Sequence, residues 1–162
     1  GTQVQRKVQP VALFHYWFNS WRTACSRMAK VSFYLFEKSN ERQVESTCRL
    51  CRKILKQPEH IWLYCSDPDL QQQLDEQLWS FDPGSFIPHG IDQELATICI
   101  SSRLPEQSDW IVFNFNNQAI EQIDKFSHII EIIENNESAK RQGREKFKQY
   151  RRLGIEPRTF KL

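Results

Sequence analysis

Residues 61–68 read Ile61-Trp-Leu-Tyr-Cys65-Ser-Asp-Pro68 and decide the fold. The first five form a short, nearly continuous apolar run, which is typical of a strand buried on both faces of a parallel sheet. The next three predict a helix start, because Asp67 can accept a hydrogen bond from an early backbone N–H and Pro68 has no N–H to leave unpaired. A strand that passes directly into a helix indicates an α/β fold.

Apolar runs and periodic stripes extend this pattern along the chain. Strands are predicted at 31–36, 61–65, 96–101, 110–115 and 126–132, and helices at about 40–56, 68–79, 118–124 and 136–153. In the first helix the apolar stripe is Val44, Cys48, Cys51 and Leu55, and Pro58 ends it. We therefore expect an α/β fold, a single Rossmann-like domain with a mostly parallel sheet covered by helices on both faces.

Length and composition limit the class of protein. The 162 residues carry a formal net charge of +2, which suits one ordinary globular domain. No apolar run approaches the roughly 18 residues that span a bilayer, so we expect no membrane partner. Five cysteines form no disulfide framework, which favours a reducing, cytoplasmic location.

The charges are divided sharply along the chain. Residues 1–27 contain four basic and no acidic side chains, residues 28–137 contain 9 basic and 18 acidic, and residues 138–162 contain 9 basic and 2 acidic. Such an excess of positive charge at one end indicates the docking site of an anionic partner, although a charge run can also be a solvated face.

The N-terminal segment is expected to stand apart from the domain. Met28 is the only methionine, and a convincing strand begins three residues later. We therefore expect Met28 to be the natural start, with 1–27 an upstream or disordered extension and 28–162 the folded domain.

The usual signatures of α/β enzymes are missing from the sequence. The five glycines form neither a G-x-G-x-x-G turn nor a P-loop, which argues against a nucleotide cofactor and a nucleotide hydrolase. Cys48-Arg-Leu-Cys51 has the spacing of a zinc site, but no second pair of ligands exists and both thiols fall on an apolar helix face. We therefore expect both thiols to be buried and to bind no metal. The four histidines are scattered along the sequence, so we expect no cofactor and no enzymatic activity.

The last helix carries the strongest functional signal. Lys140, Arg144, Phe147 and Arg151 are spaced i, i+4, i+7 and i+11, so they share one face, with Lys148 at its border. The neighbouring sector, which we expect to pack on the sheet, contains Ala139, Gly143, Tyr150 and Leu153. The cationic face fits an acidic peptide with an apolar residue, a nucleic-acid strand, or a solvated surface without a partner.

A second feature is the aromatic segment between Leu78 and His89. Trp79, Phe81, Phe86 and Ile87 lie in or beside a loop with two prolines. They either pack under the sheet edge or form an exposed interface patch. The apolar character of these side chains, taken alone, favours packing in the core.

These residues also resemble a known family. Phe33-Tyr-Leu35, Leu78-Trp79 with Ser85-Phe-Ile-Pro-His89, and Arg144-Glu-Lys-Phe-Lys-Gln-Tyr-Arg151 before Gly154 are similar to the chi subunit of bacterial DNA polymerase III holoenzyme, over about residues 28–162. The resemblance implies a non-catalytic accessory subunit of the clamp-loader complex. It would link the psi subunit to the acidic, Phe-terminated C-terminal tail of single-stranded-DNA-binding protein.

The resemblance also implies where each partner binds. The tail site would comprise Lys140, Arg144, Phe147, Lys148 and Arg151. The psi surface would comprise Trp79 and Phe86, which reverses the preference for the core, and a helicase-like protein could compete there. Contact with nucleic acid would be mainly indirect; the alternative is a direct single-stranded nucleic-acid-binding protein that uses the basic C-terminal helix.

Overall fold

The computed structural model describes residues 30–37, 40, 42–54, 60–80 and 87–161. The expected extension 1–27, Phe81 and Phe86 of the aromatic segment, and Leu55 and Pro58 at the end of the first predicted helix lie outside these residues. The described elements are β1 Lys30–Leu35, α2 Gln43–Ile54, β2 His60–Tyr64, α3 Pro68–Ser80, β3 His89–Ile91, β4 Ile98–Ser101, β5 Trp110–Asn114, β6 His128–Ile133, α4 Glu137–Arg152 and β7 Arg158–Lys161.

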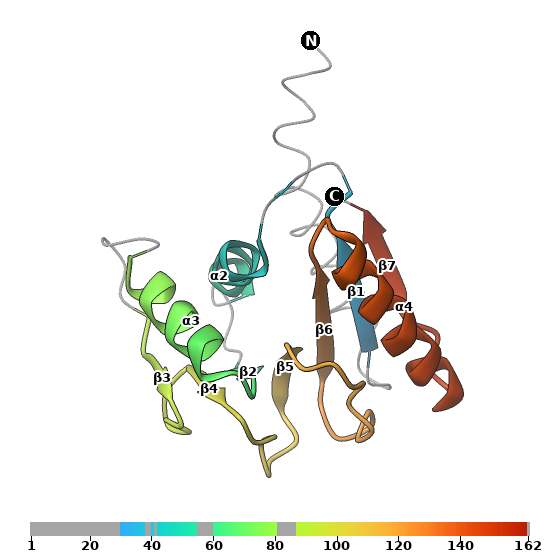
Figure 1. Cartoon of the computed structure of the whole chain (residues 1–162). Helices are drawn as coiled ribbons and strands as arrows, with labels where there is room; N and C mark the ends of the chain where they lie inside the picture. The colour runs from blue at the N-terminus through green and yellow to red at the C-terminus, as the bar shows by residue number, and fades with distance from the viewer. Residues whose placement is uncertain (1–29, 38–39, 41, 55–59, 81–86, 162) are drawn as a thin grey trace.

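These strands form one seven-stranded sheet in the order β3-β4-β2-β5-β6-β1-β7, as Figure 1 shows. Every pair of neighbouring strands is parallel. The α/β prediction is therefore confirmed, and the sheet is parallel throughout rather than mostly so.

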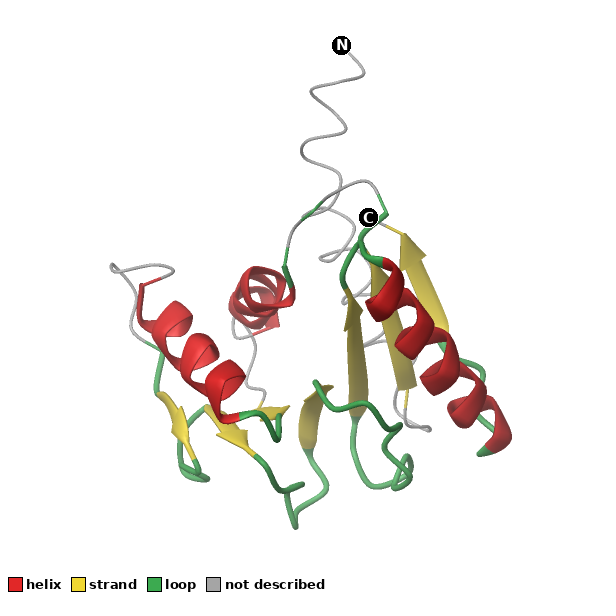
Figure 2. Ribbon diagram, viewed as in Figure 1, coloured by secondary structure: helices red, strands yellow, loops and turns green. Residues whose placement is uncertain are grey.

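Apolar side chains cover both faces of the sheet, because successive strand residues point to opposite sides. On one face α2 and α3 pack over a core that includes Tyr34, Leu63 and Ile111. On the other face α4 packs over a core that includes Phe33 and Trp62. Figure 2 shows α2 and α3 together at one side of the sheet and α4 beside β6, β1 and β7. None of the described helices has the length and apolar character needed to cross a membrane.

The helix boundaries follow the capping residues. Asp67 Oδ1 accepts from the Asp69 N–H at 3.0 Å at the start of α3, which confirms the predicted cap. At the end of α4, Gly154 has φ +90° and Ile155 N–H bonds the Tyr150 carbonyl at 3.1 Å. These features are those of a Schellman C-cap, which needs the left-handed backbone that glycine adopts without strain.

Two predictions about the fold were wrong, and two strands were not predicted. The helix expected at 118–124 does not form; this segment is irregular, and the Ala119 and Ile120 N–H groups bond to side chains of α4. The sequence also gave no sign of β3, which has three residues, or of β7, an edge strand with one half-buried side chain, Phe160. Leu153, expected to pack on the sheet, is 41% exposed because it lies at the C-cap of α4.

Candidate functional site

A groove of about 260 Å³ runs between α4 and the strands β1 and β7. We call it the α4 groove. Its apolar lining residues are Phe33, Leu35, Ile133, Gly143 and Phe147. Its charged and polar lining residues are Lys140, Arg144, Lys161, Glu37 and Thr159.

The aromatic part of the groove is fixed by packing against the sheet. The half-buried Phe147 ring lies 5.4 Å from the ring of Phe33 on β1, and Phe33 in turn meets Tyr150 edge-on at 5.9 Å. A Cβ at Gly143 would lie 2.9 Å from Ile133 Cδ1, so glycine lets α4 approach β6 closely. Phe147 is therefore neither sealed in the core nor fully exposed.

Three cations and one carboxylate line the groove. Lys140 and Arg144 stand one turn apart on α4. Lys161 comes from β7, and Glu37 lies two residues after the end of β1. The Lys161 ammonium and the Glu37 carboxylate are 3.9 Å apart. The lining thus carries an excess of positive charge beside an apolar floor.

The structure does not bring all five predicted tail residues together. Lys140, Arg144 and Phe147 line the α4 groove, but Lys148 and Arg151 do not. Lys148 pairs with Glu145 and Arg151 with Glu156, each at 3.4 Å and well exposed. Exposed pairs of this kind contribute little energy, so either cation can leave its glutamate for another anion.

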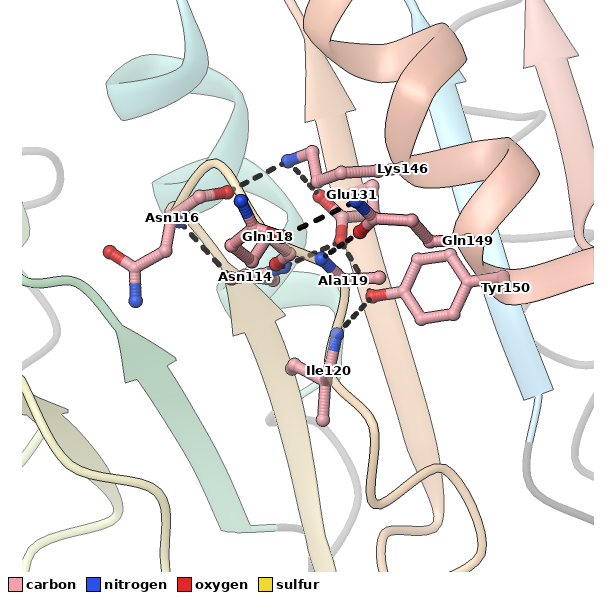
Figure 3. A network of polar contacts seen from close by, with 9 residues as sticks. All are labelled: Asn114, Asn116, Gln118, Ala119, Ile120, Glu131, Lys146, Gln149 and Tyr150. Carbon is pink, nitrogen blue, oxygen red and sulfur yellow. Dashed lines mark hydrogen bonds and ion pairs between the residues drawn. The ribbon is translucent and has the colours of Figure 1, made fainter. Parts of the chain in front are cut away.

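The opposite side of α4 holds a buried charge network, drawn in Figure 3. The Glu131 carboxylate in the middle of β6 accepts from Lys146 Nζ at 2.5 Å, from the Tyr150 hydroxyl at 2.7 Å and from Asn114 Nδ2 at 2.8 Å. Lys146 also donates to the Asn116 carbonyl at 3.1 Å. Burial, and then the Glu131 charge, raises the pKa of Tyr150 well above its ordinary value, so the hydroxyl stays protonated and donates.

The same side of the helix organises the segment that follows β5. The Ile120 N–H donates to the Tyr150 hydroxyl at 3.2 Å, and the Ala119 N–H donates to Gln149 Oε1 at 2.8 Å. Sequence reasoning missed this network. The available signal was a glutamate in the middle of the apolar strand 128–133, which must find a buried partner.

The predicted psi residues are placed only in part. Trp79, at the end of α3, is 56% exposed and therefore not part of the core. Its ring meets His89 edge-on at 5.0 Å. The His89 ring lies near Asp75 at 3.5 Å and contacts the Ile87 carbonyl at 2.8 Å. Phe86 lies outside the described residues.

The crevice at the carboxyl ends of the strands, where open α/β folds bind ligands, has a volume of about 420 Å³. At this crevice the N-termini of α2 and α3 already hold carboxylates of the chain itself. Asp67 caps α3, and Glu134 accepts from the Gln43 N–H of α2 at 3.0 Å. A phosphate would have to displace these groups, which disfavours nucleotide binding.

The remaining candidate for metal binding is the pair Cys48 and Cys51 on α2. Cys48 and Cys51 are buried, as predicted. No cluster of three metal-ligating side chains occurs among the described residues.

Comparisons of the sequence with known proteins agree on one family. A model of the family described as "DNA polymerase III chi subunit, HolC" matches residues 28–158. DNA polymerase III subunit chi of Pseudomonas aeruginosa is 28% identical over 139 residues, which cover 83% of this chain and 98% of the relative. That of Haemophilus influenzae is 26% identical over 136 residues, which cover 78% and 94%. The C-terminal domain of S. cerevisiae Dbp5, solved bound to Gle1, shares only the fold, with a TM-score of 0.53 and 11% identity over 83% of this chain and 90% of that one.

Proposed function

The chain belongs to the family of DNA polymerase III chi subunits, proteins of DNA replication, and from this premise we propose that it is a non-catalytic adaptor. One surface would bind the psi subunit of the clamp loader, and the α4 groove would bind the acidic C-terminal tail of single-stranded-DNA-binding protein. The adaptor has no part in the chemistry of DNA synthesis.

The α4 groove is the observation that carries this proposal. A C-terminal phenylalanine has an apolar ring and a carboxylate within one residue. The apolar floor around Phe147 suits the ring, and Arg144 can bind a carboxylate through two parallel hydrogen bonds. Lys140, one turn away, suits a second carboxylate of an acidic tail, while Lys148 and Arg151 add attraction at longer range.

The proposed mechanism is tethering. Two weak contacts through one adaptor raise the effective concentration of the clamp loader near DNA coated with single-stranded-DNA-binding protein. Because charge attraction at α4 is screened by salt, the tail contact should weaken as ionic strength rises.

Calorimetry with an acidic peptide that ends in phenylalanine tests the tail site. We expect Arg144→Ala to weaken binding about tenfold or more, because it removes a charge-assisted contact. Lys148→Ala, outside the groove, should weaken it only about twofold through loss of a screened charge. Arg103→Ala removes an equal charge elsewhere and is the matched control. Wild-type affinity in the Arg144 variant would overturn the assignment.

A pull-down of single-stranded-DNA-binding protein with and without its tail separates the adaptor from a direct nucleic-acid binder. The adaptor requires the tail and binds bare oligonucleotide weakly. A direct binder would hold bare oligonucleotide tightly, with a steep dependence of affinity on salt.

The psi contact is supported by the exposed indole of Trp79, since tryptophan is enriched among the residues that dominate interface energies. We propose that Phe86 belongs to the same surface, where a helicase-like protein could compete. Trp79→Ala should reduce co-purification with psi while the free energy of unfolding changes by less than about 1 kcal/mol, because the side chain is mostly exposed. A variant that keeps its psi complex would contradict this.

A further inference from the structure

One carboxylate lines the otherwise cationic α4 groove. Glu37 comes two residues after Leu35, and Leu35 of β1 lies opposite Lys161 of β7 in the strand register. The backbone therefore holds Glu37 and Lys161 near each other, and their charged atoms are 3.9 Å apart. Their side chains are 39% and 64% exposed, so solvent reaches the pair and it can open.

The charges are arranged asymmetrically across the groove. Lys140 and Arg144 line its helix side, and the Glu37–Lys161 pair lines its strand side. A peptide carboxylate on the helix side meets two positive charges. On the strand side it meets a cation whose charge is already offset by a neighbouring carboxylate.

On the basis of the proposed tail site, we propose that Glu37 is a specificity-determining residue of the α4 groove. Its negative charge repels acidic groups from the strand side and so directs the carboxylates of a bound peptide along α4. Lys161 attracts the peptide less strongly while the Glu37 carboxylate lies beside it.

The size of the effect follows from Coulomb's law. Two like charges about 6 Å apart in water repel each other by an energy that corresponds to about a threefold change in affinity. The Debye length falls from about 10 Å at 0.1 M salt to about 3 Å at 1 M, so the effect should vanish at high salt.

The test compares Glu37→Gln with wild type by calorimetry, at 0.05 M and 1 M salt. The probes are an acidic peptide that ends in phenylalanine and the same peptide with each aspartate replaced by asparagine. Glu94→Gln is the matched control, because Glu94 forms a similarly exposed ion pair with Arg103, at 3.2 Å, and does not line the groove.

We expect Glu37→Gln to bind the acidic peptide about threefold more tightly at low salt, and the asparagine peptide, which keeps only its C-terminal carboxylate, with a smaller gain in affinity. The Glu94 variant should match wild type with both. Equal or weaker binding of the acidic peptide by Glu37→Gln would overturn the role of Glu37 and leave the tail site intact, since a carboxylate that orders Lys161 for the peptide gives that result. A wild-type protein that binds neither peptide would overturn the tail site itself.

Discussion

Replacing Lys146 with methionine tests how much the buried network under α4 stabilises the domain. The Lys146 and Glu131 side chains are 8% and 0% exposed and in direct contact. Methionine keeps most of the side-chain volume but leaves the Glu131 charge without its cation. Removing one partner of a buried ion pair costs about 3–5 kcal/mol. We expect a loss near 3 kcal/mol, because Tyr150 and Asn114 still donate to the carboxylate.

The double variant Lys146→Met with Glu131→Gln separates charge from packing. Glutamine carries no charge, and its carbonyl oxygen can still accept from Tyr150. A buried ion pair replaced by neutral groups is often close to neutral in stability, so we expect the double variant to regain about 2 kcal/mol of the loss.

Urea unfolding followed by far-ultraviolet circular dichroism measures these changes. Arg103→Met, which breaks the exposed pair with Glu94, is the control and should cost at most about 1 kcal/mol. If Lys146→Met were as stable as this control, or if the double variant were no more stable than Lys146→Met alone, the assigned energetic role of the network would be refuted.

Two further predictions concern a buried histidine of β6 and a glycine of α4 that lines the groove. Burial, and then the charges of Lys30 and Arg158, holds the pKa of His128 well below its ordinary value. The His128 side chain takes up a proton near pH 6.5 in the unfolded chain but not in the folded chain. The free energy of unfolding is therefore unaffected by His128 above about pH 6.5 and falls by up to about 1.4 kcal/mol per pH unit below it. His128→Gln should remove that slope in urea unfolding between pH 5 and 8. Gly143→Ala should lower the free energy of unfolding by about 1 kcal/mol, because overpacking against Ile133 outweighs the gain in helix propensity. If the variant were more stable than the wild type, the Ile133 side chain would have to move aside easily.

The sequence predicted those parts of the fold whose signal is local. Apolar runs such as 61–65 mark central strands because both faces of a parallel sheet are buried. The capping residues Asp67 and Gly154 mark helix ends because they act within one turn. Edge strand β7 escaped prediction because its side chains are mostly exposed and carry no apolar run.

The candidate site could be predicted only in part for the same reason. Helical spacing placed Lys140, Arg144 and Phe147 on one face, and these three line the α4 groove. Lys161 and Glu37 could not be foreseen, because they meet α4 only through the pairing of β7 with β1. Periodicity alone could not exclude Lys148 and Arg151 from the lining, since the groove is narrower than the cationic face.

The cations of α4 divide into those that folding accounts for and those that it does not. Lys146 neutralises a buried carboxylate, and Lys148 and Arg151 pair with glutamates on or just beyond the helix. Arg151 also lies in the last turn, where positive charge interacts favourably with the helix dipole.

No comparable structural role explains Lys140 and Arg144. They stand four residues apart, a spacing at which like charges destabilise a helix by about 0.2–0.5 kcal/mol. Among the described residues, neither has a carboxylate within ion-pair distance in the structure, and both line a groove with an apolar floor. Positive charge without an anion of the described chain can be solvated or can bind an anion from outside the chain, and the apolar floor beside Lys140 and Arg144 favours the second explanation. A ligand carboxylate at these two side chains is therefore the explanation that the energetics of α4 favour.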